Sequence, residues 1–226
     1  MSNHCVLELK NISKRFFGVH ALNGVHFNAY DSKVNVLMGE NGAGKSTLMK
    51  ILAGAIIKDS GEIYINSEMV NIQTPEDSLR HKVAMIYQEF NLVNDLTVAE
   101  NIFLGREPTK RGFVNKNWLI SEAARLIEAY ELDISPTEIV ANLSMAKKQM
   151  LEIVKALSQN AKIIVMDEPT SSLTEHEVEQ LFSIIKRLNS DGVTVIYISH
   201  RMEEVFSIGD YVTVLRDGHF IGEWPP

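Results

Sequence analysis

The sequence contains little of what a secreted or membrane-embedded chain needs. Cys5 is its only cysteine, so no intrachain disulfide can form and a disulfide-stapled scaffold is excluded. Residues 1–10 lack the basic region and apolar stretch of a signal peptide. The longest apolar runs, around 163–166 and 193–198, are far shorter than the roughly 20 residues that cross a bilayer. We therefore expect a cytoplasmic protein that serves a membrane only through a partner.

Positive charge is scarce as well. The chain has 22 Lys and Arg against 29 Asp and Glu, so its formal net charge is −7. No long basic run occurs, whereas nucleic-acid phosphates are bound by clustered Lys and Arg. We therefore expect no nucleic acid partner. A hydrophobic share of 45% and a length of 226 residues instead fit a globular protein with a sizeable core.

Strand-like and helix-like patterns alternate along the chain, which indicates an α/β fold with a largely parallel sheet. Between Leu96 and Leu157, Ala, Leu and Glu dominate and β-branched clusters thin out, as in a helical insertion. Residues 6–12 alternate apolar and polar side chains, as an edge or half-exposed strand does. The other predicted strands are 27–30, 34–38, 62–65, 83–87, 162–166, 193–198 and 211–216, and the predicted helices are 46–52, 121–130, 175–189 and 202–207.

A glycine-rich segment between a predicted strand and a predicted helix has the clearest chemistry. Residues Gly39–Ser46 have the sequence GENGAGKS, which is the P-loop pattern. Its glycines allow backbone N–H groups to converge on phosphate oxygens, and the following helix adds the positive end of its dipole. We expect Lys45 to reach the β- and γ-phosphates of ATP and the Ser46 hydroxyl to ligate Mg²⁺.

Two acids follow another predicted strand. Residues 163–166 are apolar, and Asp167 and Glu168 come at the strand end where ligands bind in doubly wound sheets. We expect Asp167 to hold Mg²⁺ through water, and Glu168 to polarise the attacking water as general base. Such a pair alone is equally typical of a solvated loop. The upstream P-loop and the Pro169-Thr170 that follows favour the catalytic interpretation.

Taken in order, these motifs resemble those of the ATP-binding domains of ABC transporters along essentially the whole chain. The series is the P-loop, Tyr87-Gln88, Leu143-Ser144, Asp167–Thr170 and Ile198–His200. The resemblance implies a P-loop NTPase core with a mostly parallel sheet, a small antiparallel β subdomain and a helical subdomain insertion. It also implies one ABC ATP-binding domain over 1–226, in which 1–88 and 161–226 form the catalytic core plus β subdomain and 89–160 forms the helical subdomain.

The resemblance also assigns roles that the residue pattern leaves open. It implies that Phe17 stacks on the adenine ring, that Gln88 touches Mg²⁺ or the attacking water, and that His200 bonds the γ-phosphate. In full, the residues expected at ATP are Phe17, Gly39, Glu40, Asn41, Gly42, Ala43, Gly44, Lys45, Ser46, Thr47 and, in trans, Ser144; those at Mg²⁺ are Ser46, Gln88 and Asp167; the catalytic ones are Glu168, His200, Lys45 and Gln88.

Three segments, 39–47, 100–107 and 197–202, resemble the importers of ribose, arabinose, galactose and similar sugars. In that group two ATP-binding domains are fused, and the resemblance implies that this chain is the N-terminal half. The resemblance implies a cytoplasmic protein that is peripheral on the inner face of the cell membrane. Its partners would be a second ATP-binding domain, fused or a second copy, and transmembrane permease subunits. A periplasmic sugar-binding protein would be an indirect partner.

The segment that matches the family's signature departs from its usual Leu-Ser-Gly-Gly-Gln. Leu143-Ser144 is followed here by Met145-Ala146-Lys147, so both glycines are missing. Ser144 stays at the predicted N-cap of a helix that runs through 150–157. There its hydroxyl and the helix dipole would bind a γ-phosphate in trans. Thr174 stands where the family often has an aspartate that helps couple the two sites.

The sequence thus predicts an ATPase that couples Mg-ATP hydrolysis to monosaccharide import. One alternative is a nucleotide-binding regulatory module that does not hydrolyse ATP, which the altered signature favours. Glu168 and His200 argue against it. The other alternative is a non-transport ABC ATPase that acts on DNA or ribosomes. That function would favour long coiled-coil insertions or basic arms, and the sequence has neither.

Overall fold

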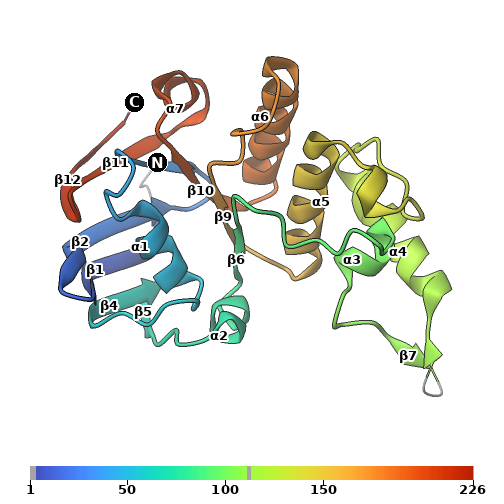
Figure 1. Cartoon of the computed structure of the whole chain (residues 1–226), viewed down its shortest axis with the longest axis horizontal. Coiled ribbons are helices and arrows are strands. Elements are labelled where there is room, and N and C mark those ends of the chain that lie inside the picture. The colour runs from blue at the N-terminus through green and yellow to red at the C-terminus, as the bar shows by residue number, and fades with distance from the viewer. Residues whose placement is uncertain (1–3, 111–112, 226) are drawn as a thin grey trace. The chain divides into compact units, whose positions relative to one another are not determined.

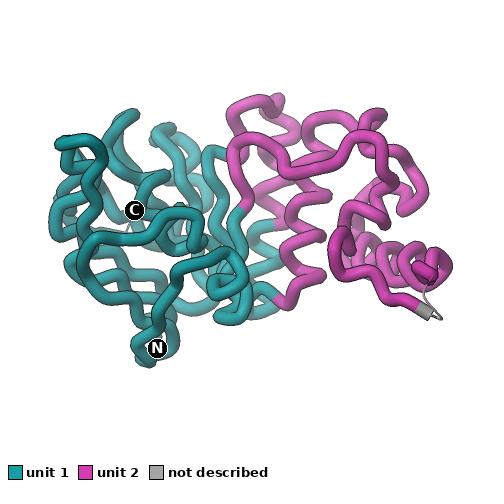
Figure 2. Tube along the Cα trace, turned by 60° about the horizontal axis from the view of Figure 1, so that its bottom comes forward, with its two compact units in different colours: residues 1–85, 161–168, 185–226 teal, residues 86–160, 169–184 magenta. Residues whose placement is uncertain are grey.

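The structure is a computed structural model that describes residues 4–110 and 113–225. Helices and strands alternate along the chain as expected (Figure 1). The chain divides into two compact units: residues 1–85, 161–168 and 185–226 form the first, and 86–160 and 169–184 the second (Figure 2). Over the described ranges, no helix is both long enough and apolar enough to cross a membrane. The assignment of 1–226 to one domain with a helical subdomain over 89–160 stays a prediction.

The first unit contains the expected small antiparallel sheet. Its strand order is β2 (Val19–Tyr30), β1 (Cys5–Phe16), β4 (Ser60–Ile65) and β5 (Glu68–Val70). The half-exposed character predicted for residues 6–12 is present, but β1 is an interior strand that pairs with both β2 and β4. Alternation reports that one face is buried, and it carries no information on how many neighbours a strand has.

A six-stranded sheet forms the rest of the first unit's framework, and its parallel strands confirm the predicted fold class. Its order is β12 (His219–Trp224), β11 (Tyr211–Arg216), β3 (Val34–Met38), β10 (Thr194–Ser199), β9 (Ile163–Asp167) and β6 (Val83–Ile86). The strands β11, β3, β10 and β9 run parallel, and β12 returns antiparallel after the turn at Asp217-Gly218. Every residue of β9 and β10 is buried, as strands covered on both faces must be.

One apolar core joins the two sheets of this unit to α1 (Lys45–Leu52). The helix contributes Leu48, Met49, Ile51 and Leu52, all without exposed surface, to a cluster that also contains side chains of β1, β2, β4, β9 and β10. Burial of each such side chain stabilises the fold by about 1.5–3 kcal/mol. Because α1 is fixed by this core, the loop that precedes it is fixed at both ends, by β3 and by α1. The short helices α2 (Pro75–Arg80) and α7 (Met202–Ile208) complete the described part of this unit's framework.

The second unit is mainly helical, as the composition between Leu96 and Leu157 predicts. It contains α3 (Val98–Ile102), α4 (Lys116–Ala129), a 3-10 turn at Val140–Asn142 and α5 (Met145–Ser158), with a small hairpin of β7 (Thr109–Lys110) and β8 (Phe113–Val114). The predicted helix 121–130 begins earlier because the Asn115 side chain caps it by accepting from the Trp118 N–H. The helix α6 (Glu175–Ser190) spans a boundary between the two units.

A buried asparagine organises the start of the helical unit. Asn101 on α3 has no exposed surface, and its amide accepts from the Val93 N–H at 2.8 Å and donates to the carbonyls of Val93 and Thr97. These bonds tie the segment that leads into α3 to the helix itself.

Asn101→Ala is therefore expected to lower the free energy of unfolding by about 1–3 kcal/mol, because it leaves polar backbone groups of Val93 without their partner. Urea unfolding of the full chain measures this. The matched control is Asn94→Ala, at an exposed position, which should stay within about 0.5 kcal/mol of the unchanged chain. Equal effects of the two substitutions would contradict the role given to Asn101.

Candidate functional site

The loop Gly39–Ser46 lies between β3 and α1, as predicted, and packing limits two of its positions to glycine. A Cβ on Gly39 would lie 2.4 Å from the Leu215 carbonyl oxygen of β11. Gly44, the N-cap of α1, has φ +99, and a Cβ there would lie 2.6 Å from the Ala21 carbonyl oxygen. Since neither backbone atom can move aside, the neighbouring strands fix the path of the loop.

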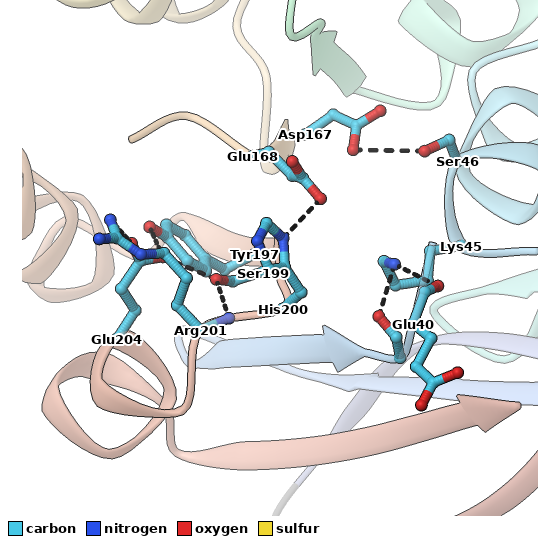
Figure 3. Close-up of polar contacts among 11 residues, drawn as sticks. Glu40, Lys45, Ser46, Asp167, Glu168, Tyr197, Ser199, His200, Arg201 and Glu204 are labelled. Atoms are coloured by element: carbon cyan, nitrogen blue, oxygen red, sulfur yellow. Dashed lines mark hydrogen bonds and ion pairs between the residues drawn. The ribbon is translucent and has the colours of Figure 1, made fainter. Parts of the chain in front are cut away.

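The Lys45 side chain folds back over this loop. Lys45 is the first residue of α1 and only 5% exposed. Its ammonium donates to the carbonyl oxygens of Gly39, at 2.7 Å, and Glu40, at 3.0 Å (Figure 3). A buried ammonium held in this way, at the positive end of a helix dipole, suits an anion such as a phosphate.

The hydroxyl of Ser46 and the carboxylate of Asp167 meet at the end of β9. Ser46 Oγ donates to Asp167 Oδ1 at 3.4 Å. Burial raises the pKa of Asp167, and the nearby Glu168 raises it further, while the Ser46 bond and the cations Lys50 and Lys45 lower it. A hydroxyl and a carboxylate are the hard oxygen ligands that Mg²⁺ prefers.

These residues fit Mg²⁺ only as part of a larger ligand set. No cluster of three or more His, Cys, Asp or Glu in the described part of the chain could hold a metal by itself. Mg²⁺ is usually bound through one or two carboxylates together with water and substrate phosphates. The pair Ser46 and Asp167, adjacent to a P-loop, matches that donor set.

Glu168 and His200 lie side by side, one residue beyond the ends of adjacent parallel strands. In the β9–β10 register Asp167 pairs with Ile198, and the Glu168 N–H donates to the Ile198 carbonyl at 3.1 Å. Glu168 has φ +46, uncommon for a residue with a side chain, and its Oε1 lies 3.0 Å from His200 Nδ1 (Figure 3). Since an ionised carboxylate only accepts, Nδ1 is assigned the proton.

Phe17 occupies the turn between β1 and β2. Its φ is +42, and its side chain is fully exposed. A large apolar side chain with no protein contact is available to an aromatic ligand. The exposed Phe17 side chain is therefore available for stacking.

The remaining predicted residues, Gln88 and Ser144, belong to the second unit. Gln88 is exposed and follows β6, and three residues later Asn91 is held by α5. The Asn91 N–H donates to Glu152 at 2.6 Å, and Lys155 donates to the Asn91 carbonyl at 2.7 Å. Burial raises the pKa of Glu152. Sequence reasoning missed this contact, since nothing in the pattern links residues so far apart.

Ser144 is the N-cap of α5, as predicted, and its Oγ accepts from the Lys147 N–H at 3.3 Å. Met145 and Ala146 form the first turn of the helix, and neither has a positive φ. The missing glycines therefore cause no backbone strain in this conformation. The Met145 side chain is exposed, Ala146 is buried, and Lys147 pairs with Asp133 at 3.1 Å. The segment therefore forms a capped, unstrained helix start without the two glycines.

The comparisons with known families and with curated proteins agree with one another. A family described as "ABC transporter" matches residues 22–171. The chain is 49% identical over 220 residues to a ribose import ATP-binding protein of Streptomyces avermitilis, covering 97% of this chain and 42% of the relative. It is 47% identical over 223 residues to a galactose/methyl galactoside import ATP-binding protein of Mannheimia succiniciproducens, covering 99% and 44%. The chain thus spans less than half the length of these curated relatives.

Solved structures with the same fold are also ATP-binding cassettes. A nucleotide-free cassette from an ABC transporter superposes with a TM-score of 0.87 at 26% identity, covering 98% of this chain and 91% of the other. A dimeric cassette in a post-hydrolysis state, bound to ADP and Pi, superposes with a TM-score of 0.80 at 27% identity, covering 97% and 98%. The fold described above is therefore that of ATP-binding cassettes.

Asp167→Asn is expected to raise the melting temperature of the chain at neutral pH without nucleotide or metal. Because burial raises the pKa of Asp167 in the folded state, its ionisation costs stability above the unfolded pKa. Neutral Asn removes that cost, so the gain should shrink as the pH falls toward about 4, the ordinary pKa of an Asp.

Thermal melts with a chelator across pH 4–8 measure this effect. The control is Asp217→Asn, at a side chain 86% exposed, which should change little. A lower melting temperature for Asp167→Asn at neutral pH would show that the carboxylate is net stabilising, contrary to this expectation.

Proposed function

The chain belongs to the ABC transporter family, and on that premise we propose that it binds Mg-ATP and hydrolyses it to power the import of a monosaccharide. One observation carries this proposal. The Ser46–Asp167 pair and the Glu168–His200 pair lie at the ends of adjoining strands, beside a loop that holds a buried lysine. Their placement within one unit of the chain supports the proposed metal binding, water activation and phosphate binding.

In the proposed mechanism the backbone N–H groups of 39–47 and the Lys45 ammonium bind the phosphates. Phe17 stacks on the adenine. Ser46, Asp167 through water, and Gln88 would hold Mg²⁺, which neutralises charge that develops on the phosphates. Glu168 accepts a proton from the attacking water as general base. His200, whose Nδ1 bonds Glu168, orients that carboxylate and bonds the γ-phosphate.

The site is completed in trans by a second ATP-binding domain, either fused to this one or a second copy of it. Ser144 at the N-cap of α5 would face the partner's nucleotide, where its hydroxyl and the helix dipole bind the γ-phosphate. The unstrained conformation of Met145 and Ala146 supports a working signature. The dimeric cassette among the structural neighbours supports the pairing.

The proposals of sugar import and of the partner proteins rest on the relatives. Two of them are described as ribose and galactose import ATP-binding proteins. On this basis we propose that the chain is one ABC ATP-binding domain, with residues 89–160 as a helical subdomain that contacts transmembrane permease subunits on the cytoplasmic side. A periplasmic sugar-binding protein would be an indirect partner.

A nucleotide-binding regulatory module is the second candidate. The loss of both signature glycines favours it, because glycine allows the closest backbone approach to a phosphate. Such a module would bind ATP and show no turnover with any partner domain.

Lys45→Ala is expected to weaken ATP binding roughly 10- to 100-fold, since a charge-assisted hydrogen bond contributes about 1.5–3 kcal/mol. Calorimetric titration with Mg-ATP measures the change. Lys186→Ala removes the same charge from an exposed position on α6 and should leave the affinity unchanged. Equal affinities for all three proteins would exclude Lys45 from the phosphate site.

Glu168→Gln is expected to bind ATP within a few-fold of the unchanged chain and to lower turnover by about 10²–10⁴, the usual contribution of a general base. The measurement is the ATPase rate at increasing chain concentration, with Glu175→Gln, exposed on α6, as the matched control. Normal turnover by Glu168→Gln would refute the general-base assignment.

The concentration series also separates the two candidate functions. A rate per chain that rises with concentration would mean that two copies pair and each supplies Ser144 in trans. No turnover alone or with an added partner domain, while ATP still binds, would favour the regulatory module.

A further inference from the structure

A buried carboxylate lies under the loop that carries His200. Glu204, in the first turn of α7, is only 5% exposed. Its Oε2 accepts from the Ser199 hydroxyl at 2.7 Å and from the Tyr197 hydroxyl at 3.0 Å, both donors being buried on β10. Its Oε1 accepts from the Arg201 guanidinium at 3.0 Å (Figure 3). The carboxylate therefore collects donors from both sides of His200 in the sequence.

The Ser199 hydroxyl links these contacts to the main chain. While donating to Glu204, its oxygen accepts from the Arg201 N–H at 3.1 Å. A hydroxyl that donates in one direction and accepts from the other is fixed in orientation. The peptide units before and after His200 are thus tied to one carboxylate.

The position of the His200 side chain depends on these backbone contacts, because the side chain itself is half-exposed. The side chain is 52% exposed, and its hydrogen bond runs from Nδ1 to Glu168 Oε1 at 3.0 Å. The position of a half-exposed imidazole is set mainly by its backbone and by this bond to Glu168. Glu168, in contrast, is fixed by its position directly after β9 and by its N–H bond to Ile198. The relative position of the two side chains therefore depends on the backbone at His200.

Keeping a charged carboxylate buried at Glu204 costs free energy. Anchoring the helix α7 would not by itself require a charge there. A buried carboxylate is destabilising unless it is paired and hydrogen-bonded, and an apolar residue of similar volume is often as stable or more so. The donors of this carboxylate, Tyr197, Ser199 and Arg201, lie on both sides of His200 in the sequence, which gives the arrangement a use at the site.

We propose that Glu204 is a positioning residue that holds His200 in hydrogen-bonding reach of Glu168. This rests on the proposed function, in which Glu168 is the general base. Glu204 touches neither nucleotide nor metal in this scheme; it acts through the His200 backbone, by way of Ser199 and Arg201. Its loss therefore lowers the rate of the chemical step much more than it weakens nucleotide binding, to which His200 contributes one phosphate contact among several.

A double-mutant cycle on the full chain tests this. Glu204→Gln keeps the side-chain shape and is expected to lower kcat about 10-fold or more while KM changes less than about 3-fold. In a His200→Ala background the same substitution should change the residual kcat less than about 2-fold, because coupled residues are non-additive. Glu203→Gln, on an exposed neighbour with the same charge, should change neither. An equal fold-loss in both backgrounds would overturn the proposal.

A second measurement does not depend on turnover and separates failure of this proposal from failure of the proposed function. The ¹⁵N shift of His200 Nδ1, measured in the nucleotide-free chain, reports its bond to Glu168. In Glu204→Gln it should move toward the value in Glu168→Gln, and in Glu203→Gln it should stay in place. An unchanged shift in Glu204→Gln overturns the positioning role, whatever the ATPase rate of the unchanged chain.

Should Glu204→Gln fail to fold, Ser199→Ala tests the same link by removing the hydroxyl that joins Glu204 to the Arg201 N–H. It should shift the His200 resonance in the same direction and lower kcat. If it does neither, the proposal fails.

Discussion

Parallel pairing of β3, β10 and β9 sets the geometry of the candidate site. In this register Met38 pairs with Ser199, and Ile198 with Asp167. The next residue along each strand is then Gly39, His200 or Glu168, so the three strands deliver the start of the phosphate loop, the histidine and the carboxylate at one edge. A register shift of one residue would turn the His200 or Glu168 side chain to the opposite face. Because β9 and β10 are packed on both faces, such a shift would also disrupt the close packing of the core.

Buried polar groups around this edge are each satisfied by a nearby partner. Lys45 donates to loop carbonyls, Asp167 accepts from Ser46, and Glu204 accepts from β10 and Arg201. Desolvation raises the pKa of Asp167, which reflects the electrostatic cost of burying a carboxylate. In all three cases a buried charged group is held by hydrogen bonds that also fix the orientation of its side chain.

In the helical unit, hydrogen bonds from charged side chains also hold a backbone segment that is distant in the sequence. The helix α5 is capped by Ser144 and, further along, holds the backbone of Asn91 through Glu152 and Lys155. The segment that follows Gln88 and the signature serine are thereby attached to a single rigid element. The two segments therefore share one helix as their support.

The sequence by itself determined the fold class, the P-loop, the acid pair after β9 and the N-cap at Ser144, because each depends on residues adjacent in the chain. It also contained signals that went unused: Thr74 with Asp77, and Thr97 with Glu100, form capping boxes that begin the short helices α2 and α3. Only the tertiary structure decided that β1 is an interior strand, that Asn91 is held by Glu152, and that Glu204 anchors the His200 loop. These outcomes depend on which strand or helix lies alongside, and local periodicity reports burial of a face without identifying the neighbour that buries it.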